Sequence, residues 1–256
     1  MKIFRFEKNV DVRLETIKRG EIYLSSPDHF NDLEDCRLQE IWTPFFEPVQ
    51  NEKLIQCLKI LYPEDGSNNI PMSKNIFDIL KDIIEYSPLP DGHFDDNLIR
   101  SLNRNSIVET LRKFIRKTTG VCCFFKDVPR HPLMWAHYAD SHTGFCVEYE
   151  VDEVSAPLYE VNYSSQLPSL SVNELIFCPE ESLLRVLTTK NLEWSYEKEV
   201  RLINLNIFQD GESGKSVPLP QSMKPVRLFT GANFVHSKNE ELLKTLNITP
   251  VPYKNI

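Results

Sequence analysis

The stretch WSYEKEVRLINLNIF, residues 194–208, constrains the fold of this chain more than any other. If it forms a strand from Glu197 onward, alternate side chains share one face. Glu197, Glu199 and Arg201 then lie on one side, with the two carboxylates about 6.6–7 Å apart along the strand. The same face continues into apolar residues from Ile203 onward. Because charges sealed in apolar surroundings are strongly unfavourable, we expect the charged half to open into a water-filled pocket at the end of the sheet.

Two alternatives remain for these charged residues. If residues 194–201 are helical, Glu197 and Arg201 form an ordinary ion pair one turn apart, and Glu199 points elsewhere. Alternatively, the two glutamates and the arginine form a buried network that fixes the fold. The strand pattern downstream favours a pocket.

Composition limits the classes of protein that the chain can belong to. Its 256 residues are 41% hydrophobic, which suffices for a real core. No apolar run approaches the roughly 20 residues of a membrane helix and the start lacks a signal peptide, so we expect a cytoplasmic protein without a membrane partner. A net charge of -8 makes general attraction to nucleic acid weak. The six cysteines lack metal-ligand spacing, so we expect buried free thiols and no metal site.

The order of predicted elements indicates an α+β fold. Residues 1–26 predict a strand, a helix and a second strand, and residues 44–118 predict a helical insertion with Pro/Gly/Asp-rich spacers. After Gly120 the pattern returns to strands, and residues 209–224 are typical of a hairpin loop. We therefore expect a single α+β domain over residues 1–256, built on a mostly antiparallel central sheet with the helical insertion within it.

A second group of polar residues follows the predicted strand GEIYLSS. Ser25 and Ser26 end that strand, and Asn31 and Asp32 lie in the loop after it. Proline, asparagine and aspartate are also what a tight loop needs for its own backbone hydrogen bonds. For Asn31 and Asp32 the two explanations, turn and binding site, are equally good.

A third group lies in HPLMWAHYADSHTGF, residues 131–145. Trp135 and Tyr138 are three apart on a predicted short helix, beside His137 and His142. Such an aromatic pair packs in a core or walls a pocket for a planar ring. Neither histidine has a cysteine or carboxylate at metal-ligand spacing.

These groups together resemble a bacterial family known as domain of unknown function 2971. The similar stretches are FRF, LSSPDHFND, LMWAHYADSHTGFCVEYE, WSYEKEVRLI and VRLFTG, and they cover most of the chain outside the helical insertion. The resemblance implies no established activity. Members are often found near mobile or defence genes, which implies a role in phage defence, for example as a toxin.

The chain also has a weaker resemblance to ADP-ribosyltransferases. In those enzymes an arginine on an early strand, hydroxyl residues at a strand end and a Glu-x-Glu on a later strand occur in this order. Here Arg5, the pair Ser25-Ser26 and the motif Glu197-Lys198-Glu199 stand in the corresponding positions. This resemblance implies NAD as the substrate, with a protein or nucleic-acid acceptor that the sequence does not identify.

The resemblance also implies a role for each residue. Glu199 would stabilise the positive charge that develops on the ribose when the nicotinamide bond breaks, beside the catalytic guanidinium of Arg201. Glu197 would orient or deprotonate the acceptor, and Arg5 would hold the NAD pyrophosphate. The residues expected to complete the NAD site are Ser25, Ser26, Asn31, Asp32, Trp135, His137 and Tyr138, with Tyr138 or Trp135 stacked on nicotinamide.

Two other functions compete with this one. A metal-dependent nuclease would use Asp32, Asp35, Glu197 and Glu199 as Mg²⁺ ligands, although Lys198 lies on the wrong strand face for a restriction-type Glu-x-Lys. A non-enzymatic sensor or antitoxin-like module would use the acidic cleft to receive a basic peptide or a phage component.

Overall fold

The computed structural model describes part of the chain. The described residues are 1–32, 34–42, 115, 117–127, 130–171, 174, 178–205, 207–208, 211–235 and 250–252. Almost all of the predicted insertion at 44–118 lies outside them, and the single-domain organisation remains a prediction. Within the described part of the chain, no helix has both the length and the apolar character needed to cross a membrane.

The chain opens as the sequence predicts, with a strand, a helix and a strand. These are β1 (Lys2–Glu7), α1 (Asp11–Lys18) and β2 (Glu21–Ser25). Gly20 follows α1 with a φ of 67°, which glycine adopts without strain, and so lets the chain reverse into β2. A short 3-10 helix, η1 (Pro27–His29), follows β2, so the proline and histidine lie in a turn.

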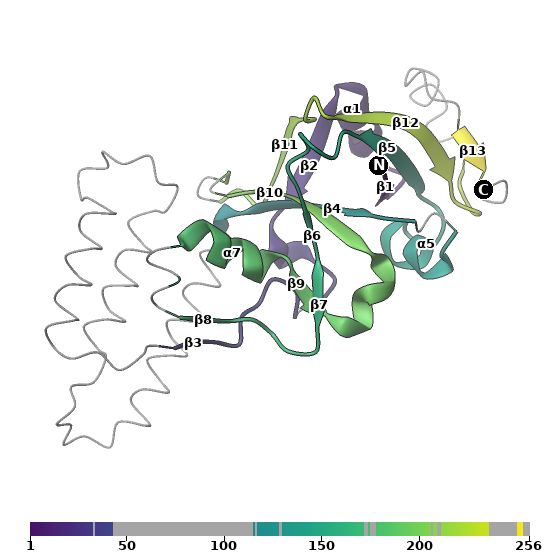
Figure 1. Cartoon of the computed structure of the whole chain (residues 1–256). Helices are drawn as coiled ribbons and strands as arrows, with labels where there is room; N and C mark the ends of the chain where they lie inside the picture. The colour runs from purple at the N-terminus through teal and green to yellow at the C-terminus, as the bar shows by residue number, and fades with distance from the viewer. Residues whose placement is uncertain are drawn as a thin grey trace, which may run out of the picture.

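A large sheet forms the centre of the fold (Figure 1). Its main path runs β11-β2-β4-β1-β5-β12-β13, and β10 pairs with both β4 and β6. The further strands are β4 (Gly120–Phe125), β5 (Phe145–Val151), β6 (Leu158–Glu160), β10 (Glu199–Asn204), β11 (Gly214–Pro218), β12 (Met223–Thr230) and β13 (Pro250–Pro252). All its pairings are antiparallel except β12 with β13. The predicted α+β class with a mostly antiparallel sheet is confirmed.

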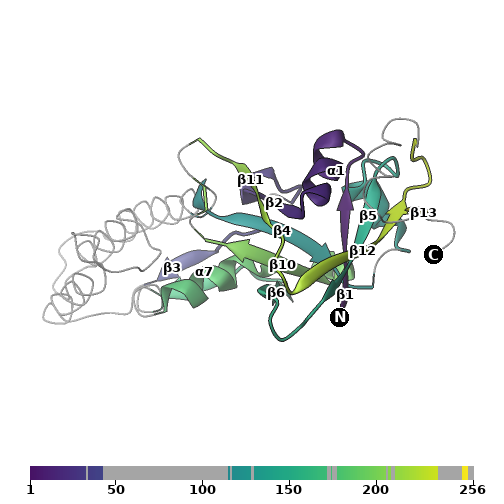
Figure 2. The same cartoon turned by 90° about the horizontal axis from the view of Figure 1, so that it is seen from above.

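Smaller elements lie around this sheet (Figures 1 and 2). They are β3 (Glu40–Trp42), α5 (Pro132–Tyr138), β7 (Asn162–Ser164), β8 (Ser169–Ser171), α7 (Pro179–Leu187), β9 (Thr189–Asn191) and the 3-10 helix η2 (Leu192–Glu197). Strand β3 pairs with β8, and β7 pairs with β9, in both cases parallel. The β7-β9 pair brings residue 190 beside the start of β10.

The two faces of the sheet carry different cores. On β4, Cys122 and Phe124 belong to the core that includes Leu14 of α1, whereas Phe125 belongs to the core that includes Trp135 of α5. Alternation along the strand therefore defines an α1 face and an α5 face. Both faces of β10 are buried. Val200 and Leu202 join the α1 core, and Glu199 and Arg201 are buried on the opposite face. The odd-numbered residues of β10 consequently lie on the face of α5.

Helix α5 is held tightly against β1. The helix ends at Tyr138, earlier than the predicted helical stretch, and Asp140, Ser141 and His142 then adopt φ values of 49°, 54° and 68°. The backbone of Gly144 follows so closely that an added Cβ would lie 2.1 Å from the carbonyl oxygen of Glu7. Only glycine fits there, so this turn fixes where α5 docks.

Two predictions about loops and strand ends were wrong. Residues 209–224 contain the strand β11, which pairs with β2 over its whole length, rather than only a hairpin loop. The strand expected from Glu197 begins at Glu199, because Glu197 ends η2 and Lys198 has a φ of 47°. All described cysteines are free thiols, as expected, although Cys178 is exposed.

Candidate functional site

Glu197 and Glu199 converge although only Glu199 lies on a strand. Asn191 caps η2 by accepting a hydrogen bond from the backbone N–H of Glu193, and the helix ends at Glu197. The left-handed conformation of Lys198 then turns the chain into β10. The backbone N–H of Glu199 donates to the hydroxyl of Tyr163 on β7, at 2.8 Å, and this bond fixes the start of the strand.

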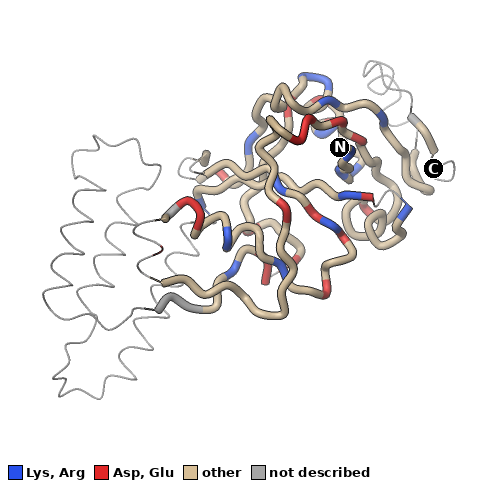
Figure 3. The backbone as a smooth tube through the Cα atoms, viewed as in Figure 1, with Lys and Arg blue, Asp and Glu red and all other residues tan. Residues whose placement is uncertain are grey.

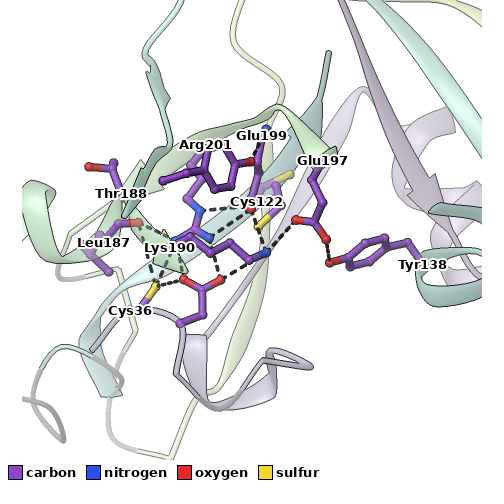
Figure 4. Close-up of polar contacts among 12 residues, drawn as sticks. Cys36, Cys122, Tyr138, Leu187, Thr188, Lys190, Glu197, Glu199 and Arg201 are labelled. Atoms are coloured by element: carbon purple, nitrogen blue, oxygen red, sulfur yellow. Dashed lines mark hydrogen bonds and ion pairs between the residues drawn. The ribbon is translucent and has the colours of Figure 1, made fainter. Parts of the chain in front are cut away.

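Lys190 of β9 joins the two carboxylates. Its Nζ donates to Oε2 of Glu197 at 2.7 Å and to Oε2 of Glu199 at 3.1 Å, and it lies 3.6 Å from Oδ2 of Asp35 (Figure 4). Lys190 is only 3% exposed, and the three carboxylate residues are 0–3% exposed. One ammonium therefore lies among three buried carboxylates.

Arg201 completes this network from β10. Its Nη1 and Nη2 donate to the two carboxylate oxygens of Asp35 at 2.9 Å and 2.6 Å, a bidentate pair. Its Nε and Nη2 donate to Glu199 at 2.8 Å and 3.1 Å, and Nη1 also donates to the carbonyl of Leu187 at 2.6 Å. The guanidinium also lies over the ring of Phe30, 5.5 Å from its centroid. We call Asp35, Lys190, Glu197, Glu199 and Arg201 the charge network.

The charge network gives its two glutamates opposite acidities. Burial raises the pKa of Glu197 and Glu199 raises it further, although Lys190 opposes both effects. Burial also opposes ionisation of Glu199, but Arg201 and Lys190 outweigh it and lower the pKa of Glu199 to about 2. Glu199 is thus a fixed anion, whereas Glu197 holds its proton more strongly than a free carboxylic acid.

Tyr138 of α5 connects the charge network to the outside. Its hydroxyl donates to Oε1 of Glu197 at 2.5 Å, and burial raises the pKa of the phenol, so it stays a donor at neutral pH. Unlike Glu197 and Glu199, Tyr138 is partly exposed. Tyr138 therefore links the buried carboxylate of Glu197 to the protein surface.

Four further aromatic side chains lie around Tyr138, on or next to α5 and η2. His137 packs edge-on against Tyr138 and Trp194, and Trp194 packs against Tyr196 with a centroid distance of 6.1 Å. His131 stacks on Tyr196 at 5.3 Å and 18°. Each of the five is at least partly exposed. We call these five residues, His131, His137, Tyr138, Trp194 and Tyr196, the aromatic surface.

The water-filled pocket expected at Glu197 and Glu199 is not what the structure shows. The three charged side chains of the motif are 0–3% exposed and are satisfied by one another, by Lys190 and by Asp35. Among the three interpretations of the sequence, the buried network matches this arrangement. The two carboxylates do lie close together, although not on one strand face, and they meet around an ammonium instead of in water.

Arg5 lies on the other side of the sheet. It pairs with Glu7 at 2.5 Å and its Nη1 contacts the thiol of Cys122, on the α1 face of β4. Glu199 and Arg201 pair in register with Phe125 and Cys123, on the α5 face. The structure therefore does not bring Arg5 to the two glutamates.

The residues after β2 act mainly in their own turn. Ser26 is buried and accepts a hydrogen bond from the N–H of Asp28 at 3.1 Å, and Ser25 lies 3.5 Å from Nδ1 of His29. Asp32 accepts from the N–H of Glu34 at 2.9 Å, a loop-forming bond. Asn31 is exposed.

The pair Trp135 and Tyr138 divides between two environments. Trp135 is completely buried and packs edge-on against Phe6 at 5.1 Å, so it belongs to the core. Tyr138 and His137 belong to the aromatic surface. Of the two side chains expected to stack on a ring, only Tyr138 is accessible.

Sequence reasoning missed Lys190 of the charge network and Tyr163, which fixes the start of β10, and it gave Asp35 too little weight. Lys190 and Tyr163 lie in short strands with no pattern that distinguishes them. Asp35 was considered only as a metal ligand. A usable signal was the charge count: two buried glutamates and one arginine need a second cation, and Lys190 supplies it from seven residues before Glu197.

Comparison with known proteins relates part of the chain to a described family. Residues 134–202 match the model of a family described as "protein of unknown function (DUF2971)". This segment contains Tyr138, Lys190 and the motif from Glu197 to Arg201, whereas Arg5 and Asp35 lie outside it. No curated protein and no solved structure matches the chain. The match supports the family resemblance over this segment and implies no activity.

Proposed function

We propose that this protein acts on the nicotinamide–ribose bond of NAD, with Glu197 and Glu199 as its catalytic carboxylates. The observation that carries this proposal is the pair itself, two carboxylates bound to one ammonium in environments that push their acidities apart. Such divided pairs are typical of sites in which one carboxylate stabilises charge and the other transfers a proton.

The chemistry follows from the two environments. When the C–N bond breaks, its electron pair passes to the nicotinamide nitrogen, which becomes neutral, and positive charge develops on the ribose. Glu199, anionic at any physiological pH, stabilises that charge. The acceptor hydroxyl or water then forms the new C–O bond and loses its proton to Glu197, whose raised pKa makes its anion a stronger base than an ordinary carboxylate.

Access to the carboxylates requires Tyr138 to move. Glu197 is 0% exposed, and its Oε1 is occupied by the Tyr138 hydroxyl. Rotation of this partly exposed side chain would open the shortest route from the aromatic surface to Glu197. The described arrangement is then the closed state of the site.

A second candidate is a binding module without catalysis, and burial is the observation that favours it. Both glutamates already have hydrogen-bond partners, so the charge network is also explained as a support that holds α5 and η2 in place. The aromatic surface would then bind a partner directly.

The geometry favours the nuclease less. Asp35, Glu197 and Glu199 do come together, but the ammonium of Lys190 lies between them, where a divalent cation would need to bind. The carboxylate of Asp32 instead accepts a hydrogen bond from the backbone N–H of Glu34 and so supports its own loop.

Incubation with labelled NAD and cell extract tests the proposal. We expect nicotinamide release or label transfer with the wild type and a loss of at least about 100-fold in Glu199→Gln, since one stabilising group in a transition state is worth this much. Glu193→Gln is the matched control, because Glu193 is an exposed glutamate on η2, six residues before Glu199. If the wild type binds NAD in calorimetry but releases no nicotinamide, the binding module replaces the enzyme.

A further inference from the structure

The aromatic surface has the composition of a site for a flat ring. It combines five ring side chains from two elements that are far apart in sequence, in contact with one another and partly open to solvent. Rings that serve only as core are sealed, as Trp135 is.

The charges behind this surface favour a cation. Three carboxylates of the charge network face two cationic groups, Lys190 and Arg201, so one carboxylate is in excess whenever all three are ionised. Lys190 lies 4.9 Å from the centroid of Trp194, so the indole connects the aromatic surface to the charge network. The negative faces of aromatic rings attract cations further.

We propose that the aromatic surface binds a cationic planar ring of the N-alkylpyridinium class, and that it thereby distinguishes the oxidised from the reduced form of a nicotinamide nucleotide. The link to a nucleotide rests on the proposed function, whereas the preference for a cationic ring does not. A neutral ring of the same shape would gain stacking but no attraction from the excess carboxylate.

The decisive comparison uses two probes of nearly equal shape, N1-methylnicotinamide, which is a cation, and nicotinamide, which is neutral. Calorimetry at pH 8 is expected to give about 5- to 30-fold tighter binding of the cation, the range that a cation–π contact supplies.

Two variants and one control locate the site. Trp194→Leu and His137→Ala should each remove the preference for the cation, and folding of both is checked by the near-ultraviolet circular dichroism of the remaining aromatic side chains. Leu192→Ala, an exposed apolar residue two positions before Trp194, should leave it unchanged if stacking rather than general hydrophobicity is responsible. Equal affinity for the two probes, or an unchanged ratio in both variants, overturns the proposal.

The test separates this inference from the proposed function. NAD cleavage with equal binding of the two probes would remove the inference and leave the function standing. Binding that prefers the cation, without NAD cleavage, would remove the proposed function and leave the inference standing. Tighter binding of methylguanidinium than of N1-methylnicotinamide would show that the surface receives an arginine side chain, and would also overturn the proposal.

Discussion

Replacement of Lys190 by methionine tests the charge network most directly. Methionine keeps most of the side-chain volume, so the change removes the ammonium with little loss of packing. Two carboxylates then lose a hydrogen-bonding cation, at 2.7 Å and 3.1 Å, in a site where every member is at most 3% exposed. In the described part of the chain Glu197 and Glu199 are 0% and 3% exposed, so regaining solvation requires local opening.

The expected loss is large for a single substitution. Removing one partner of a buried ion pair costs about 3–5 kcal/mol, because the other partner is left as an uncompensated charge. In urea, with a slope of about 3 kcal/mol per molar for a chain of this size, the unfolding midpoint should fall by about 1–2 M. Lys198→Met is the matched control, since the Lys198 side chain is 58% exposed and 3.9 Å from its partner Asp127; it should change stability by less than about 1 kcal/mol.

The pH dependence has a definite sign. In the wild type Glu199 has a folded pKa of about 2, below its unfolded value, so its stabilisation is present above about pH 4.5 and is lost as pH falls toward 2. Without Lys190 the pKa values of both glutamates rise, so falling pH protonates them and removes the uncompensated carboxylate charge of the variant. The difference in unfolding free energy between wild type and Lys190→Met should therefore shrink between pH 7 and pH 3.

Two outcomes would refute this reasoning. A loss no greater than that of Lys198→Met would mean that the ammonium is solvated in the folded protein. A difference that stays constant from pH 7 to pH 3 would mean that packing, and not uncompensated carboxylate charge, causes the loss.

Two further substitutions probe the ends of the charge network. Asp35→Asn removes the bidentate partner of Arg201, so we expect a loss of about 3–5 kcal/mol in urea unfolding; a loss below about 1 kcal/mol would show that Glu199 alone satisfies the guanidinium. Tyr138→Phe removes one hydrogen bond to a charged group, so about 1–3 kcal/mol should be lost and the apparent pKa of Glu197, followed by carboxyl NMR, should rise; a lower pKa would contradict the donor role of the hydroxyl.

Much of the architecture could be predicted because it is determined by local patterns of apolar and polar residues in the sequence. The strand, helix and strand opening, the return to strands after Gly120 and the short helix around Trp135 all appear in the structure at or near the expected positions. The clearest error on the site concerned Glu197. A single left-handed residue, Lys198, separates it from β10, and no alternation pattern shows such a turn.

The composition of the site was less predictable than its position. The motif with two glutamates and one arginine indicated where charges gather, and they do gather there. Lys190 and Asp35 could not be assigned to it, because they approach through the pairing of β7 with β9 and through a loop more than 150 residues away in the chain. Likewise, nothing local says that Arg5 lies on the opposite face of β4 from Glu199.

By itself the sequence determined the class of fold and the concentration of acidic and basic groups in one motif, because alternation and spacing are properties of consecutive residues. Acidic and basic positions are interspersed over the described backbone (Figure 3), so their proximity in sequence does not reveal the pairs they form. Tertiary structure decided whether those charges face water or one another. Their solvation depends on where β9 places Lys190 and on which distant loop brings Asp35, and burial is a property of the assembled fold.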